Sequence, residues 1–156
     1  MTQIMDAKKG ILTDEMNKAL NKGESSIVMG SVPASEVEKI QKDADMLVHV
    51  ESFHDENRYF IKHSFSTKLV DYFKMARPIL AIGPSDVASI SHLIKNDCAI
   101  YGENEEQLVQ KLLEVIENCE KLNELSIKAY NCGRLNHSDY IMKNLIKNDL
   151  GMVTNK

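Results

Sequence analysis

The sequence lacks a long apolar run, an excess of basic charge and a paired set of cysteines. No stretch approaches the roughly 20 apolar residues that a membrane-spanning helix needs, and the N-terminus has no signal-peptide core. The net charge of -4 gives no electrostatic reason to expect a nucleic-acid partner. Cys98, Cys119 and Cys132 are odd in number and lack CxxC spacing, which favours reduced thiols and a cytoplasmic protein.

The composition that remains is that of an ordinary globular chain. Its 156 residues are 43% hydrophobic and 27% charged, so we expect one domain, residues 1–156, with a sizeable core. There is no Asp-x-Asp pair, and His54, His92 and His137 show no metal-ligand spacing, so no metal is expected. His49 lies in an apolar strand and is interpreted as a hydrogen-bonded core histidine.

Short apolar runs alternate with amphipathic periods along the chain. Strands are predicted at 27–29, 46–50, 78–82 and 98–101. Helices are predicted at 12–20, 35–44, 66–76, 85–95, 103–122, 123–133 and 138–148. Ser35 with Glu38 forms a capping-box pattern, Ser85 is an expected N-cap, and Gly133 is an expected helix end. The pattern predicts an α/β fold, a Rossmann-like doubly wound parallel sheet of at least four strands with helices on both faces.

The most informative segment runs from Phe65 to Pro84. Ser66, Thr67 and Lys68 open a predicted helix, and Asp71 faces the same way one turn later. Free amides at a helix start can hold a phosphate, and a nearby carboxylate can accept hydrogen bonds from sugar hydroxyls. Ligands bind beyond the carboxyl ends of parallel strands, where the loops 30–33, 51–66 and 83–85 should gather. The sequence therefore predicts a nucleotide-sugar site.

Three segments carry a resemblance to a known family. They are Ile27–Pro33 (IVMGSVP), Ala44–Val48 (ADMLV) and Phe65–Leu80 (FSTKLVDYFKMARPIL). In this order and spacing they resemble the C-terminal, donor-binding half of GT-B fold glycosyltransferases, and more narrowly the large retaining family (group 1 type). The resemblance covers roughly residues 10–150. It implies a GT-B C-terminal lobe that lacks its leading strands and the acceptor lobe.

The resemblance also implies a set of nucleotide-sugar-binding residues: Gly30, Ser31, Val32, His63, Ser66, Thr67, Lys68 and Asp71. Gly30 and the two residues after it would lie against the nucleobase. Ser66 and Thr67 would bind the diphosphate with help from Lys68, and Asp71 would hold the ribose. Family members usually have Glu in place of Asp71, and many have a sugar-contacting Glu in place of His63. No catalytic residue is assigned.

The implied function is the donor-binding portion of a glycosyltransferase in polysaccharide biosynthesis. The nucleotide-diphosphate sugar is then the substrate, and no cofactor is expected. Without an acceptor lobe the isolated chain should transfer no sugar. A partner chain, a missing lobe or a second copy would complete it, in the cytoplasm or at the inner membrane face through that partner.

Several alternatives stay open at this point. Ser66-Thr67-Lys68 can be a plain helix cap, and Asp71 a surface carboxylate paired with Lys68 or Lys74. The chain can be a non-catalytic interaction module that keeps the fold. An epimerase of GT-B fold is a weaker alternative, and a receiver-like domain lacks its acidic cluster here. The sequence does not name the sugar, the base, the acceptor or the stereochemical outcome.

Overall fold

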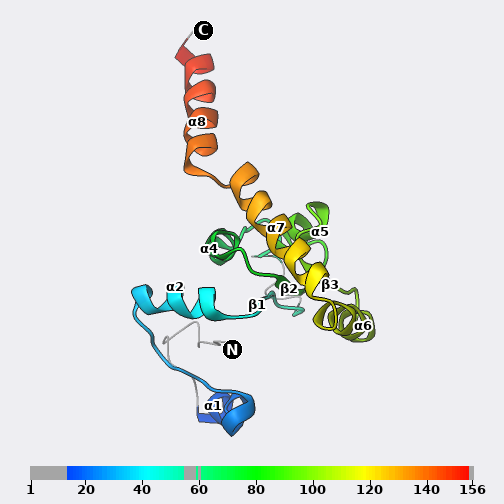
Figure 1. The fold of residues 1–156 in the computed structure, drawn as a ribbon. Helices are drawn as coiled ribbons and strands as arrows, with labels where there is room; N and C mark the ends of the chain where they lie inside the picture. Colours follow the sequence, from blue (N-terminus) through cyan, green and yellow to red (C-terminus); the bar gives the residue numbers. More distant parts are fainter. Residues whose placement is uncertain (1–13, 55–58, 60, 155–156) are drawn as a thin grey trace. The chain divides into compact units, whose positions relative to one another are not determined.

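A computed structural model describes residues 14–54, 59 and 61–154 of the chain (Figure 1). The chain divides into two compact units, residues 1–40 and 41–156, which are described separately. In the first unit, α1 spans Asp14–Leu20 and the short 3-10 helix η1 spans Gly23–Ser25. α2 spans Ala34–Asp43 and runs across the boundary between the units.

The strand predicted at residues 27–29 does not form. These residues have no regular secondary structure, and the side chains of Ile27 and Met29 are about half exposed. An extended segment becomes a strand only when a neighbouring strand pairs with its amides and carbonyls. No described residues provide that neighbour. The prediction of at least four strands is therefore wrong for the described part of the chain.

The second unit contains a parallel sheet of three strands, in the order β1-β2-β3. β1 spans Leu47–Val50, β2 spans Ile79–Ile82 and β3 spans Ile100–Tyr101. The register pairs Leu47 with Ile79, and Leu80 with Ile100. The apolar runs therefore predicted all three strands, although β3 is shorter than expected.

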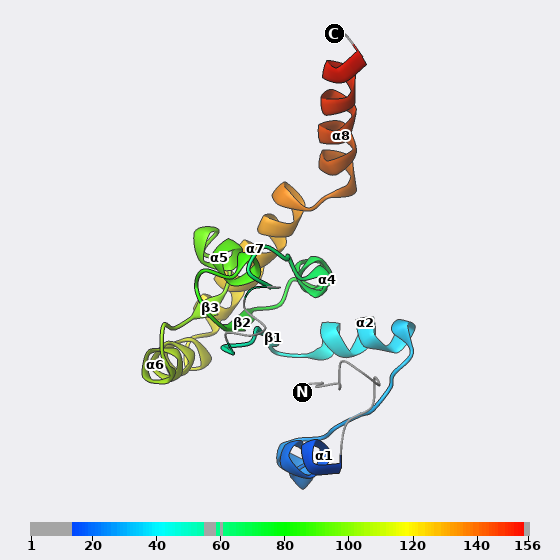
Figure 2. The ribbon, with the colours of Figure 1, turned by 180° about the vertical axis from the view of Figure 1, so that it is seen from behind.

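Helices α4 to α8 accompany the sheet in the described part of this unit. α4 spans Thr67–Met75, α5 Ala88–Lys95, α6 Glu105–Ile116, α7 Cys119–Asn136 and α8 Asp139–Thr154. α4 connects β1 to β2 and α5 connects β2 to β3, which is the crossover arrangement that parallel strands need. Figure 2 shows the same elements from behind.

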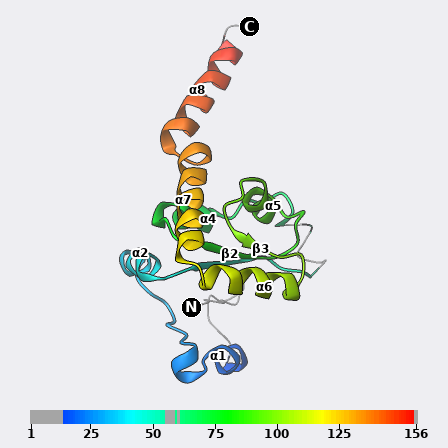
Figure 3. The same cartoon turned by 45° about the vertical axis from the view of Figure 1, so that its right-hand side comes forward.

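Helices cover both faces of the sheet (Figure 3). Ile79 and Ala81 of β2 pack in one core cluster against side chains of α4, α5 and α7. Leu80, on the opposite face, packs in a second cluster with Ile100 of β3 and Val115 of α6. The central strand is thus buried on both sides, as expected for a doubly wound α/β arrangement.

Helix boundaries differ from the sequence prediction where the cap was misassigned. Ser35 was predicted as the N-cap of this helix, but it lies inside α2. The residue before α2 is Pro33, whose carbonyl accepts hydrogen bonds from the amides of Glu36 and Val37. Ser85 lies outside α5, whose N-cap is Val87. The side chain of Asn118 accepts hydrogen bonds from the amides of Glu120 and Lys121, so it is the N-cap of α7. The segment predicted as one helix over 103–122 therefore belongs to two helices, α6 and the start of α7.

Gly133 does not end a helix. α7 continues through it to Asn136, and a Cβ atom built on Gly133 would lie 2.4 Å from the Cβ of Phe73 on α4. The glycine therefore permits close contact between α4 and α7, rather than the left-handed turn expected of a helix cap. This contact fixes the position of the helix that carries the predicted site.

Candidate functional site

The start of α4 lies where the sequence predicted it. Ser66 has an extended backbone at the N-cap position, and the amide of Leu69 donates to its carbonyl over 3.1 Å. The Ser66 side chain makes no capping hydrogen bond to the helix. Thr67 and Lys68, the first two helical residues, are exposed. Within the described part of the chain their amides have no acceptor, so they are the ones available to an anion.

The amide of Ser66 is used differently. It donates over 2.9 Å to the hydroxyl of Ser89, a fully buried residue at the start of α5. That hydroxyl lies 3.5 Å from the carbonyl oxygen of Ser64, to which it donates. The amide of Ala88 also donates to the carbonyl of Lys62 over 2.9 Å. The loop before α4 is therefore bonded to α5, and a phosphate would meet the amides of Thr67 and Lys68 rather than that of Ser66.

A carboxylate that the sequence analysis did not select lies at the same edge. Glu51 directly follows β1, and its amide donates to the carbonyl of Ile82 at the end of β2 over 2.8 Å. A Cβ atom on Gly83, whose φ is +155°, would lie 2.8 Å from the Cβ of Glu51. The ends of β1 and β2 thus meet here, as expected for parallel strands. The absence of a side chain on Gly83 allows this approach.

His49 is the partner of this carboxylate. His49 is 4% exposed, and its Nε2 lies 3.1 Å from the Oε1 of Glu51. Burial raises the pKa of Glu51, but the hydrogen bonds from His49 and Ser89 and the positive charges of His49 and Lys68 outweigh it, so the pKa is lowered. The interpretation of His49 as a hydrogen-bonded core histidine is confirmed. An ionised Glu51 therefore lies close to the positive charge of Lys68.

Asp71 lies one turn into α4 with an exposed side chain. Its Oδ1 is 3.4 Å from the Nζ of Lys74, and both side chains are more than 60% exposed. An ion pair this exposed contributes under about 1 kcal/mol, so it leaves the carboxylate open to a stronger partner. His63 is exposed in the turn before α4. Gly30, Ser31 and Val32 belong to the first unit, where Gly30 has a positive φ of +69°.

Other features of the second unit lie outside this edge. A hollow of about 290 Å³ lies beside β3, and none of the predicted site residues lines it. Among the residues that the structure describes, no three His, Cys, Asp or Glu side chains are arranged to hold a metal ion. In the same part of the chain, no helix combines the length and the apolar character needed to cross a membrane.

Arg77 does not cap α4. Its guanidinium donates instead to the carbonyl oxygen of Lys42, near the end of α2. α4 ends instead at Ala76, which adopts a left-handed conformation with a φ of +51°. The sequence signal for this end was Pro78, which cannot continue a helix.

Comparison with known proteins gives no matching family model, no similar curated protein and no similar solved structure.

Proposed function

We propose that this chain is the nucleotide-sugar donor-binding portion of a glycosyltransferase with a GT-B C-terminal lobe. The single observation that carries the proposal is the start of α4 at the carboxyl edge of a parallel sheet. Two amides without an acceptor in the described chain, those of Thr67 and Lys68, lie there, and the exposed side chain of Lys68 adds a positive charge to the same helix start. This combination suits a diphosphate because helix amides and a cation both stabilise negative charge.

The position of Asp71 supports the same assignment. It is the residue at which the sequence resemblance expects a ribose-binding carboxylate, and its side chain is exposed one turn beyond the proposed phosphate position. A carboxylate accepts hydrogen bonds from two adjacent sugar hydroxyls well because it offers two acceptor oxygens. The chemistry proposed for this lobe is to hold the donor and stabilise the departing diphosphate, and no metal is part of it.

The experiment is an NMR titration with uridine and guanosine diphosphates, read at the amides of residues 67–71. Loss of a charge-assisted hydrogen bond costs roughly 1.5–3 kcal/mol, so Asp71→Ala should weaken binding about 10- to 150-fold. Lys74→Ala is the matched control on the same helix, and it removes only the exposed ion pair. If millimolar nucleotide shifts no amide of this segment, or if the two variants behave in the opposite way, the proposed site is wrong.

A second candidate function is an interaction module that keeps the fold without catalysis. It is favoured by large apolar side chains that are exposed on α8: Tyr140, Met142, Leu145, Ile146 and Leu150. In addition, β1 pairs with β2 on one side, and no described strand pairs with its other side. Exposed apolar helices and open sheet edges are where partner chains or further copies bind. Sedimentation that shows a monomer at all concentrations would contradict binding between copies of this chain.

A further inference from the structure

Two of the three cysteines meet in the core of the second unit. Cys98 lies just before β3 and is fully buried, and Cys132 lies on α7 and is 4% exposed. Both belong to the core cluster that contains Leu69 and Phe73 of α4. The Cys98 thiol donates to the carbonyl oxygen of Leu93 over 3.7 Å, and the two thiols are near enough to shift each other's pKa in opposite directions. Cys119, by contrast, is exposed at the start of α7.

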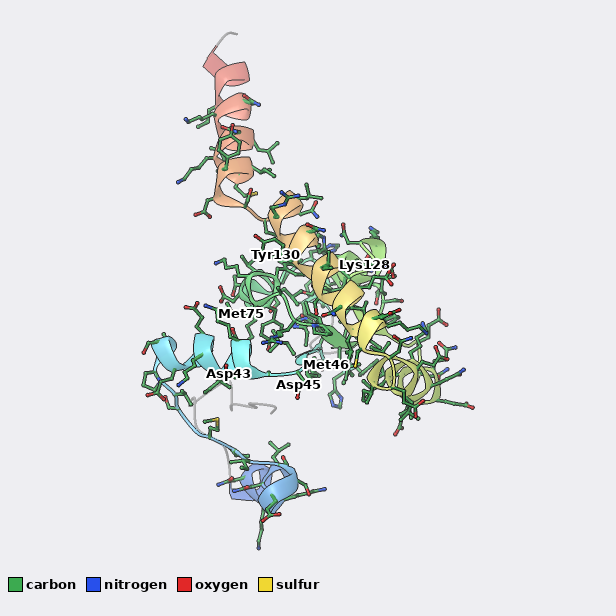
Figure 4. The ribbon with its side chains drawn as sticks, in the orientation of Figure 1. Asp43, Asp45, Met46, Met75, Lys128 and Tyr130 are labelled. Carbon is green, nitrogen blue, oxygen red and sulfur yellow. The ribbon has the colours of Figure 1, made fainter. Side chains whose placement is uncertain are left out.

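Bonds on either side hold the two sulfur atoms in place. Lys128, labelled in Figure 4, pairs with Asp97 over 2.6 Å and with Glu124 over 2.7 Å. One turn beyond Cys132, the side-chain Nδ2 of Asn136 donates to the Oδ1 of Asn96 over 3.4 Å. Positions 128, 132 and 136 are spaced four apart and so share one face of α7. Residues 96 and 97, directly before Cys98, therefore contact α7 one turn to either side of Cys132.

An imidazole and an amide face the Cys132 sulfur. The Nε2 of His92 lies 3.3 Å from it, and the Nδ2 of Asn136 donates to it over 3.6 Å. The neighbouring Cys98 thiol, and then the hydrogen bonds from His92 and Asn136, lower the pKa of Cys132 to about 5, although burial opposes this. The pKa of Cys98 is raised, because it keeps the proton that the pair shares.

We propose that Cys98 and Cys132 are a redox-active pair that closes to a disulfide when a hydroperoxide reaches it, with Cys132 as the attacking sulfur. The Cys132 thiolate attacks the peroxide oxygen and becomes a sulfenic acid, while the departing hydroxide takes up a proton and leaves as water. The Cys98 sulfur then attacks the Cys132 sulfur, its proton joins the departing hydroxyl group, and a second water leaves. Two electrons pass from the thiol pair to the peroxide.

The burial of the pair determines which oxidant it takes and where the reaction stops. A thiolate that is 4% exposed admits a molecule the size of hydrogen peroxide more readily than a tripeptide disulfide. The adjacent Cys98 thiol then traps the sulfenic acid before a second peroxide arrives. Cys119 has no such neighbour and is exposed, so it serves as an internal comparison. The bond would connect β3 to α7, on which α4 rests through Gly133.

The test treats the full chain with equimolar hydrogen peroxide at pH 7, followed by catalase, denaturation, alkylation and peptide mass spectrometry. The expected product is a Cys98–Cys132 cross-linked peptide in the wild type and in Cys119→Ser. It should be absent in Cys98→Ala. A cross-link that closes about 35 residues of chain should raise the melting temperature by roughly 5–15 °C, and dithiothreitol should reverse the increase.

The role assigned to His92 has a separate readout. His92→Gln should lower the rate of cross-linking at pH 7 by about threefold or more, and the rate should recover as the pH is raised towards 9. A variant that is merely less stable would not recover with pH. The proposal is overturned if Cys98 and Cys132 both remain alkylatable while Cys119 is oxidised, or if the disulfides formed involve Cys119. The wild-type result decides this even if a variant fails to fold.

Discussion

Replacing Gly133 with alanine should destabilise the protein, although alanine is the better helix former. On an exposed helix surface this change would gain about 1 kcal/mol. Here the new Cβ would lie 2.4 Å from the Cβ of Phe73 and 3.1 Å from its Cγ. A Cβ atom is fixed to the backbone, so no rotamer change relieves the overlap. α4 and α7 must separate instead.

The magnitude follows from the size of that separation. Carbon atoms reach their best contact at about 3.5–4.0 Å, so the two helices must move apart by roughly 1 Å. A gap of that size forfeits a quarter to a half of the dispersion energy of the atoms involved. Overpacking costs typically 1–3 kcal/mol and occasionally more. We take about 2–4 kcal/mol here because Phe73 is fully buried, which leaves a net loss of about 1–3 kcal/mol.

The assay is urea unfolding followed by circular dichroism, with the wild type measured alongside. Asn123→Ala is the matched control, since Asn123 is exposed on the same helix and its replacement should change stability by a few tenths of a kcal/mol upward. If Gly133→Ala were as stable as the wild type, the close contact between α4 and α7 would be refuted.

Two further predictions concern pH and a single hydrogen bond. Burial, and then the positive charge of His92, lower the pKa of His137, so below about pH 6.5 the unfolded chain binds a proton that the folded chain does not. The contribution of His137 to stability should therefore be constant above pH 7 and become less favourable as the pH drops through 6.5. In a pH series of urea unfolding, His137→Gln should reduce this fall, and an unchanged slope in the variant would contradict the reasoning. Tyr72→Phe removes the hydroxyl that donates to the carbonyl of Val48 over 3.2 Å and should cost about 0.5–1.5 kcal/mol in thermal unfolding. An effect within a few tenths of zero would mean that this bond contributes nothing net.

The sequence by itself determined the local elements whose cause is local. The apolar runs at 47–50 and 79–82 form buried parallel strands, because β-branched and leucine side chains suit a strand covered on both faces. The start of α4 after Ser66 and its end before Pro78 also follow from neighbouring residues alone. The sequence also predicted that the buried strand histidine His49 is hydrogen-bonded, since a buried ring must find a hydrogen bond, although it did not name the partner.

Only the tertiary structure decided the features that depend on distant residues. The run at 27–29 has strand composition but no pairing neighbour in the described chain, and Gly133 looks like a helix end but serves a close contact with Phe73. The Ser66 amide is taken by Ser89, 23 residues away, which moves the proposed phosphate position to the next two amides. Ser89 and Lys68, which are distant in sequence, help to lower the pKa of Glu51, and Cys98 and Cys132 shift each other's pKa from 34 residues apart. Hydrogen bonding, desolvation and close packing depend on distances in space, and sequence periodicity carries no information about them.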